Sequence, residues 1–358
     1  MPQLFDPLTI RSVTVRNRIW VSAMCQYSIG AKNGVVGDWH LVHLGGMARG
    51  GAGLVMAEAT AVSAEARISD EDTGIWNAEQ ASAWARVVNF VHSQGAVAGI
   101  QLAHAGRKAS IYSEWSTPLT GTLPLAEGGW QTVSASDLPF ADLDSPLALD
   151  AEGIDKVVAD FEAAGRRALD AGFDVLEVHA AHGYLVHQFL SPLSNERTDE
   201  YGGSLENRAR LLLRIVAALR ALSAEAPLFV RLSATDYAEG GWDQEQTATV
   251  AGWAHSAGAD FFDISSGGNI TGVTIPSGPG YQVHLASFVH DNADVPVSAV
   301  GRITEAQQAS DIVTSGRADA VMLGREMLRD PHFALRAAHE LGVDLEYWPK
   351  QYLRARWS

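Results

Sequence analysis

Short apolar runs recur along the chain, and each is followed by a stretch with helical periodicity. The runs have the length and the aliphatic character of strands that are buried on both faces. They are residues 19–24, 53–59, 96–102, 173–178, 228–233, 261–265, 295–300 and 318–323. Strands that alternate with helices form a parallel sheet, and eight such units close on themselves. The pattern therefore predicts a (β/α)8 TIM barrel.

Polar caps and glycines bound the helical stretches. We expect helices at residues 38–49, 79–94, 151–171, 205–224, 244–258 and 304–315, with a short helix after residue 281. Asp38 is placed to cap the first helix, and Gly50 to end it. Residues 8–15 predict an N-terminal hairpin that caps the barrel. An open doubly wound sheet is the main alternative, but no Gly-x-Gly-x-x-Gly motif follows the first strand. No domain boundary is visible, so residues 1–358 are expected to form one domain.

Two irregular passages interrupt the alternation. Residues 106–149 follow the third strand and are rich in Ser, Thr, Pro and Gly, and residues 184–204 follow the fourth. Loops of this length in a compact chain are usually functional. Barrels of this kind place their chemistry at the carboxyl ends of the strands. We therefore expect two long insertions on the face that carries the active site.

Composition excludes several classes of partner. The net charge of −16 and the pI near 5.1 would repel a nucleic acid backbone. The single cysteine, Cys25, leaves no internal disulfide and no cluster held by several thiolates, which suits the cytoplasm. The start of the chain lacks an export signal, and no apolar run approaches the roughly 20 residues of a spanning helix. We expect a cytoplasmic protein without a membrane or nucleic acid partner.

The fourth strand ends in three polar rings, His179, His182 and Tyr184. Each needs a hydrogen-bond partner once water is excluded, so their grouping indicates a pocket. A satisfied core histidine beside a loop tyrosine is the alternative. Two histidines three residues apart also allow a metal site, with Asp263 and Glu58 as further ligands. That site would leave the phosphate loops described next without a purpose, so no metal is expected.

Two Gly-Arg pairs end the last two strands, Gly301-Arg302 and Gly324-Arg325. These loops form the usual phosphate site of a barrel, where glycines expose backbone N–H groups and a guanidinium binds in a bidentate manner. Surface arginines in solvent are the alternative. A cofactor with one phosphate is expected across the mouth of the barrel.

Other residues at the strand ends suit such a cofactor. Arg231 lies within an apolar strand and must have a partner, either a cofactor that becomes anionic on reduction or a structural ion pair. Gln101 offers both a donor and an acceptor to a heterocycle. The turn at 22–25 brings small residues and amides to the first strand end. Its Cys25 is either an inert buried thiol or a reactive one, and no activating base is evident.

Together these stretches resemble the flavin-dependent Old Yellow Enzymes, or ene-reductases, and within them the shorter bacterial branch with a cysteine beside the flavin. The likeness covers nearly the whole chain. It is carried by residues 4–8, 24–27, 101–108, 179–184, 195–203 and 323–326. Two departures are Ala23, where a proline is common, and the ending Ala355-Arg356-Trp357, where Gly-Trp is usual.

The resemblance implies one FMN-binding barrel domain that uses NADPH or NADH to reduce the activated C=C bond of α,β-unsaturated carbonyl compounds by a ping-pong mechanism, with nitro compounds as a further class. His179 and His182 would polarise the carbonyl, hydride would pass from FMN N5 to the β carbon, and Tyr184 would protonate the α carbon. Tyr27 would help to bind the substrate, and Lys108 would lie near the flavin. The implied FMN contacts are Ser22, Ala23, Met24, Cys25, Ala59, Gln101, Arg231, Gly301, Arg302, Gly324 and Arg325.

The resemblance also implies a homodimer or homotetramer in which an arginine near the carboxyl terminus reaches the neighbouring pocket. Arg354 is the best match, with Arg356 as the alternative. Two other functions stay open. A tRNA dihydrouridine synthase would share the barrel and FMN, but should carry a basic face and a catalytic cysteine near the third strand. A barrel that binds a phosphorylated ligand without turnover would reduce no enone.

Overall fold

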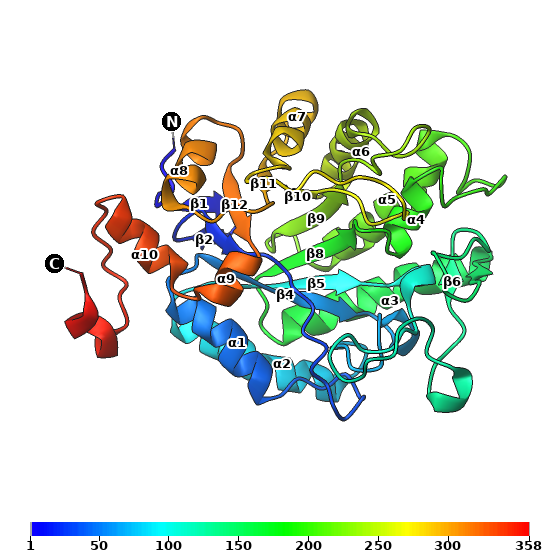
Figure 1. The fold of residues 1–358 in the computed structure, drawn as a ribbon, viewed down its shortest axis with the longest axis horizontal. Coiled ribbons are helices and arrows are strands. Elements are labelled where there is room, and N and C mark those ends of the chain that lie inside the picture. Colours follow the sequence, from blue (N-terminus) through cyan, green and yellow to red (C-terminus); the bar gives the residue numbers. More distant parts are fainter. Residues whose placement is uncertain (1, 358) are drawn as a thin grey trace.

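A closed barrel of eight parallel strands forms the centre of the computed structural model, which describes residues 2–357 (Figure 1). Around the barrel the strands are β3 (Ile19–Val21), β4 (Leu54–Ala61), β5 (Val97–Ala103), β8 (Val175–Ala180), β9 (Leu228–Ser233), β10 (Phe261–Ser265), β11 (Val297–Ala299) and β12 (Ala320–Leu323). Pairing of β12 with β3 closes the ring. The predicted (β/α)8 barrel is confirmed.

Helices follow the strands and surround the barrel in Figure 1. The larger ones are α1 (Asp38–Arg49), α2 (Ala78–Ser93), α3 (Ala151–Asp170), α5 (Leu205–Leu222), α6 (Gln244–Ala257), α7 (Val283–Ala293), α8 (Ala306–Thr314) and α10 (Phe333–Glu340), and the short ones are α4 (Leu185–Leu190) and α9 (Arg325–Arg329). Gly50 ends α1 as expected. The predicted Asp38 cap is wrong by one residue, because Gly37 is the cap and its N–H donates to His40 Nδ1. No helix in residues 2–357 is long and apolar enough to cross a membrane.

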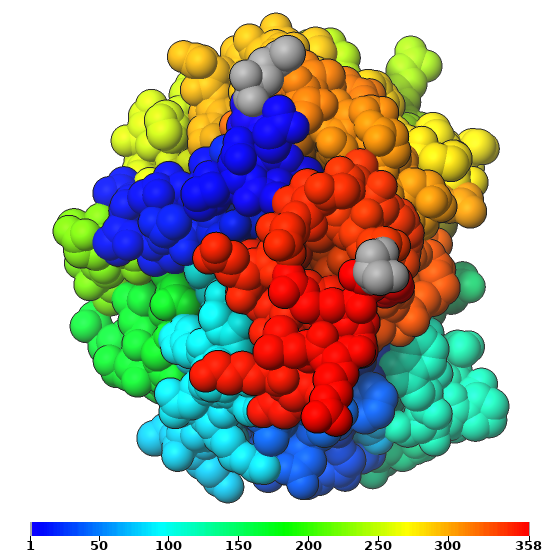
Figure 2. Space-filling view, turned by 90° about the vertical axis from the view of Figure 1, so that its left-hand side faces the viewer, coloured from blue at the N-terminus to red at the C-terminus, as the bar shows by residue number. Residues whose placement is uncertain are grey.

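The predicted hairpin is present as β1 (Leu8–Ile10) and β2 (Val13–Val15). Asn17, just after it, donates from Nδ2 to Tyr347 Oη, 3.0 Å away. Figure 2 shows the result on one face, where the N-terminal segment in blue lies against the C-terminal segment in red. The two ends of the chain thus pack against each other.

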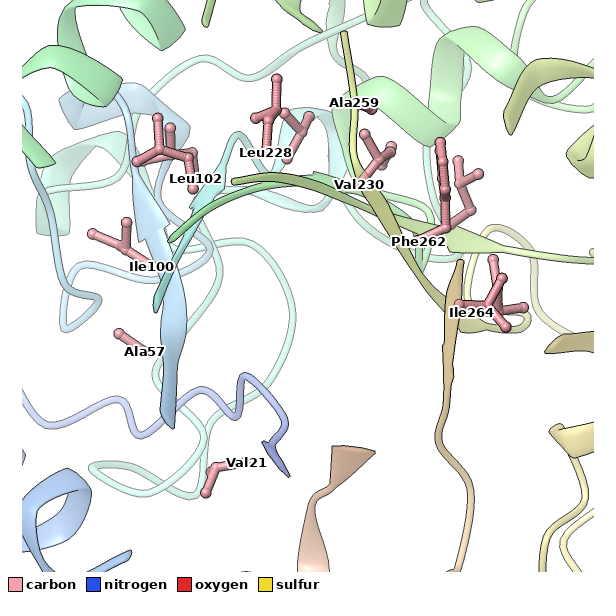
Figure 3. Packing of buried hydrophobic residues seen from close by; sticks show 14 of the residues in the cluster. Val21, Ala57, Ile100, Leu102, Leu228, Val230, Ala259, Phe262 and Ile264 are labelled. Atoms are coloured by element: carbon pink, nitrogen blue, oxygen red, sulfur yellow. The ribbon is translucent and has the colours of Figure 1, made fainter. Parts of the chain in front are cut away.

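Alternate residues of each strand face the helices or the barrel interior. Ile100, Val230 and Phe262 belong to the large cluster between strands and helices (Figure 3). On the other face, Trp20 and Phe261 pack with their ring centroids 5.0 Å apart. The interior towards the amino ends of the strands is therefore apolar and closely packed, and the polar residues lie at the carboxyl ends.

Both predicted insertions are present at the carboxyl ends of their strands. Residues 104–150 follow β5 and contain the short strands β6 (Val133–Ser134) and β7 (Leu147–Ala148) together with the 3-10 turns η2 (Gly106–Lys108) and η3 (Leu125–Glu127). Residues 181–204 follow β8 and contain α4. In Figure 1 the first insertion projects from the barrel near the β6 label. The two insertions cover the face on which the polar strand ends gather.

Candidate active site

The turn after β8 carries the polar rings and has an unusual backbone. His182 adopts φ +56° and Gly183 φ +74°. A Cβ atom at residue 183 would lie 2.3 Å from the Gly268 carbonyl oxygen, so only glycine fits there. The close approach to Gly268 fixes the direction in which His182 and Tyr184 leave the turn.

Side chains from distant loops hold His182 by its main chain. Its N–H donates to Ser233 Oγ at 2.9 Å, and its carbonyl accepts from Lys108 Nζ at 2.9 Å. Lys108 also donates to the Gly268 carbonyl and lies 5.0 Å from the centre of the Tyr184 ring. Lys108 therefore contacts the turn itself and ties it to the loop after β10.

A buried His–Asp pair holds Gly183. The Gly183 N–H donates to His187 Nδ1 at 2.9 Å, so the imidazole carries its proton on Nε2. That nitrogen lies 3.2 Å from Asp236 Oδ1, and both side chains are fully buried. Gln188 Nε2 donates to the Gly183 carbonyl at 2.7 Å. Every main-chain polar group of the residues 182 and 183 thus bonds to a side chain.

The three rings predicted to act together lie side by side. The His179 ring centroid is 5.2 Å from that of His182 and 4.9 Å from that of Tyr184. Burial, followed by the charge of Arg231, lowers the pKa of both histidines well below its usual value. His179 Nδ1 accepts from the Ala181 N–H, so its Nε2 carries the proton. His182 Nε2 hydrogen-bonds Ser265 Oγ at 2.7 Å. The imidazoles are neutral.

Two tyrosines line a cavity of about 1000 Å³ beneath the first insertion, Tyr27 and Tyr184. Burial raises the pKa of each phenol above its usual value. Both rings therefore keep their protons at neutral pH, and each can donate a hydrogen bond or a proton to a molecule in this cavity.

Arg231 has the structural partner that the sequence left open. Its Nε lies 2.9 Å from Asp263 Oδ2 inside the barrel. Gln101 Nε2 donates to Glu177 Oε1 at 2.7 Å, and burial with the charge of Asp263 raises the pKa of Glu177 to about 8. Arg231 also lines the cavity described next. Arg231 can therefore form a structural ion pair and also contact a cofactor, because its guanidinium contacts the Asp263 carboxylate and lines the cavity.

A second cavity, of about 240 Å³, lies between the last two strand ends. Its lining includes Arg231, Gly301, Arg302, Gly324 and Arg325, so the structure brings both Gly-Arg pairs together. Gly301 has φ +126°, which a residue with a side chain adopts only under strain. Three guanidinium groups and two glycine backbones form a donor set that suits a phosphate.

The turn after β3 contacts Leu323 and Gly324, which line the second cavity, and leads to Tyr27, which lines the first. Ser22 N–H donates to the Leu323 carbonyl, and Met24 Sδ lies 3.5 Å from where a Gly324 Cβ would stand. Burial, and then the charges of Glu58 and Asp72, raises the pKa of Cys25. Cys25 is therefore a thiol at neutral pH, which matches the unreactive alternative.

Glu58 and Asp263, the further metal ligands considered, are engaged elsewhere. Glu58 lies 3.2 Å from His40 Nε2 and accepts from the Gln26 N–H, and Asp263 pairs with Arg231. Across residues 2–357, no group of three or more histidine, cysteine or acidic side chains could hold a metal ion. A register shift in β4 at Glu58 places Ala59 opposite Gln101.

The geometry has close counterparts among known proteins. The family model of the NADH:flavin oxidoreductase / NADH oxidase family matches residues 3–344. The NADPH dehydrogenase of Listeria innocua is 45% identical over 356 residues and 99% of both chains. The chain belongs to this family. The NADPH dehydrogenase of Bacillus subtilis is 43% identical over 352 residues and 98% of both chains.

Solved structures place this family member among the Old Yellow Enzymes. Morphinone reductase superposes with a TM-score of 0.78 at 29% identity, over 96% of this chain and 91% of the other. An Old Yellow Enzyme homologue from Zymomonas mobilis gives a TM-score of 0.80 at 27% identity, over 99% and 98%. The protein is an FMN-dependent oxidoreductase of the NADPH dehydrogenase type, and the residues of the phosphate cavity fit the FMN phosphate.

Within this Old Yellow Enzyme, one predicted residue stands apart from the others. Arg354 lies in the exposed 3-10 turn η4 (Lys350–Ala355), away from both cavities of its own chain. Its expected contact with a neighbouring subunit stays a prediction. Sequence reasoning missed His187, Gln188 and Asp236, although a third histidine five residues after His182 was a visible signal.

Proposed function

We propose that the protein reduces the activated C=C bond of α,β-unsaturated carbonyl compounds, and of nitroalkenes, in a ping-pong reaction with NADPH or NADH. One observation carries the proposal. Two neutral imidazoles and a protonated phenol, from His179, His182 and Tyr184, adjoin at one strand end with ring centroids 4.9 to 5.2 Å apart. FMN, when bound, supplies the hydride that reaches the β carbon.

The chain's own residues stabilise and protonate the substrate. His179 and His182 polarise the carbonyl oxygen, and loss of one such preorganised donor costs about 3–4 kcal/mol of barrier. Tyr184 delivers its proton to the α carbon, and Tyr27 binds the substrate from the other side of the cavity. Arg231 offsets the negative charge of the reduced cofactor, although Asp263 already neutralises part of its own charge.

The remaining assignments follow the same proposal. The residues that hold FMN are Ser22, Ala23, Met24, Cys25, Ala59, Gln101, Arg231, Gly301, Arg302, Gly324 and Arg325. Residues 1–358 form one FMN-binding domain in the cytoplasm, and a homodimer or homotetramer brings Arg354 to the neighbouring pocket.

The two half-reactions test the roles separately. The purified protein should be yellow and should bleach with NADPH without oxygen. His179→Ala or His182→Ala should weaken phenol binding and slow alkene reduction much more than flavin reduction, whereas the surface variant His92→Ala should change neither. Equal slowing of both half-reactions would contradict the histidine assignment. An unchanged rate of enone reduction in Tyr184→Phe would point to another proton donor.

A further inference from the structure

Beyond Lys108, the first insertion carries charge of one sign only. Residues 109–150 contain six carboxylates and no lysine, arginine or histidine. The six are Glu114, Glu127, Asp137, Asp142, Asp144 and Asp150. A segment of this length would be expected to contain several cations at the composition of the chain, which has 26 lysines and arginines in 358 residues. Residues 109–150 therefore form an acidic cover over the active-site face.

Three of these carboxylates line the cavity that leads to the paired tyrosines. Glu114, Asp142 and Asp144 are exposed and share its wall with Tyr27 and Tyr184. A cleft lined by one sign of charge concentrates ions of the opposite sign and repels ions of its own. A charged substrate bound in this cavity beside Tyr184 therefore lies in the field of these carboxylates.

Lys108 is the one lysine or arginine among the described residues that line this cavity, and it does not offset the charge of the carboxylates. Lys108 is turned inward, where its Nζ donates to the His182 and Gly268 carbonyls. Burial lowers its pKa to about 8. The Lys108 ammonium lies 4.5 Å from the centre of the Phe140 ring. It is bound within the turn and is not presented to a ligand at the mouth.

Aromatic rings accompany the carboxylates. Tyr112 and Phe140 line the same cavity, and the Trp115 ring packs edge-on against Tyr27 with centroids 5.9 Å apart. Rings beside carboxylates attract ammonium groups, because the face of each ring is electronegative. The wall thus offers an ammonium group two kinds of favourable contact, whereas its carboxylates repel a carboxylate or phosphate.

We propose that the acidic insertion selects alkenes by charge, so that the preferred acceptors are α,β-unsaturated carbonyl compounds bearing an ammonium group, followed by neutral ones, with carboxylate- or phosphate-bearing acceptors the least favoured. This inference rests on the proposed alkene reduction and adds the substrate class. NADPH is itself an anion. Added salt should therefore raise kcat/KM for NADPH and lower kcat/KM for a cationic acceptor.

The test uses three cyclic enones that differ in one substituent, an ammonium, a neutral or a carboxylate group. At low ionic strength kcat/KM should fall in that order over about a hundredfold, and the spread should shrink as salt screens the wall. In Glu114→Gln/Asp142→Asn/Asp144→Asn the ammonium enone should lose about tenfold and the carboxylate enone gain about tenfold, while the neutral enone stays unchanged.

A matched variant controls for net charge alone. Asp170→Asn/Glu225→Gln/Asp291→Asn removes the same number of exposed carboxylates, at or near the C-terminal ends of α3, α5 and α7. This variant should keep the wild-type order of kcat/KM for the three enones and the wild-type ratio between the highest and the lowest value. Equal effects of the two triple variants, or no charge order at low salt, would overturn the proposed selection.

Binding separates this proposal from the reaction on which it rests. Dissociation constants of an ammonium-bearing and a carboxylate-bearing phenol, measured from the flavin absorbance of the holoenzyme, should show the same charge order without turnover. If that order holds while no enone is reduced, the reaction is wrong and the selection stands. If the neutral enone is reduced but no charge order appears, the selection alone is wrong.

Discussion

Replacing His187 with phenylalanine tests whether the buried pair with Asp236 holds the turn at His182 and Gly183. The variant keeps a ring in place but removes both nitrogens, so the Gly183 N–H and the Asp236 carboxylate each lose a partner. Breaking a buried pair by removing one partner costs about 3–5 kcal/mol, since the remaining charge stays buried. Ser191 Oγ and the Trp242 N–H still donate to Asp236, which places the expected loss towards the lower value.

The melting temperature gives the readout. An unfolding entropy of about 2.1 cal/mol/K per residue, over 358 residues, corresponds to about 0.75 kcal/mol per kelvin. A loss of about 3–5 kcal/mol should therefore lower the melting temperature by about 4–7 °C, measured by circular dichroism of the holoenzyme. Phenol binding should weaken too, because His182 and Tyr184 leave from the turn that His187 holds.

An exposed His–Asp pair in the same chain provides the control. His92 Nε2 lies 2.7 Å from Asp174 Oδ2, but 38% of the His92 side chain is exposed. A pair of this kind contributes about 0–1 kcal/mol, so His92→Phe should shift the melting temperature by no more than about 1–2 °C. If His187→Phe and His92→Phe lower the melting temperature equally, the reasoning about the buried pair is wrong.

Three further predictions concern the same face of the barrel. Arg302→Ala and Arg325→Ala should each weaken FMN binding by roughly tenfold or more, since hydrogen bonds to charged groups contribute about 1.5–3 kcal/mol, and the exposed Arg317→Ala should not. Gly183→Ala should lower the melting temperature and phenol affinity, because its Cβ would lie 2.3 Å from a carbonyl oxygen. Burial lowers the pKa of Lys108 from 10.5 to about 8, so the unfolded chain binds that proton more tightly than the folded chain does. The free energy of unfolding of the wild type, relative to that of Lys108→Met, should therefore rise between pH 8 and 10 when measured by urea unfolding.

The fold followed from the strand pattern because both faces of each barrel strand are buried. Continuous apolar runs such as Leu228–Ser233 and Phe261–Ser265 match their strands from end to end. The first strand was predicted to reach residue 24 but ends at Val21. Beyond it the Gln26 N–H bonds to the Glu58 side chain on the next strand, and Tyr27 takes φ +48°. Such contacts between strands leave no local pattern.

The candidate site was predictable for a topological reason. In a parallel barrel every carboxyl end lies on one face, so His179, Arg231 and Gly301 had to approach one another once the strands were recognised. The partner of Arg231 was not predictable, since many acidic residues could have met it. Register decided it, because Asp263 stands directly beside Arg231 in the neighbouring strand.

The residues that hold the candidate catalytic side chains in place could not be predicted in the same way. His187 lies in the short helix α4 and Asp236 in the loop after β9, so both lie beyond the strand ends, and the strand pattern does not predict that they meet. The candidate catalytic side chains thus lie at or just past strand ends, and residues farther along the connecting segments make the hydrogen bonds that hold the turn at 182 and 183. The strand pattern does not identify His187 or Asp236 as functional. Substitutions at either residue should nevertheless alter function, because these residues hold the turn from which His182 and Tyr184 extend.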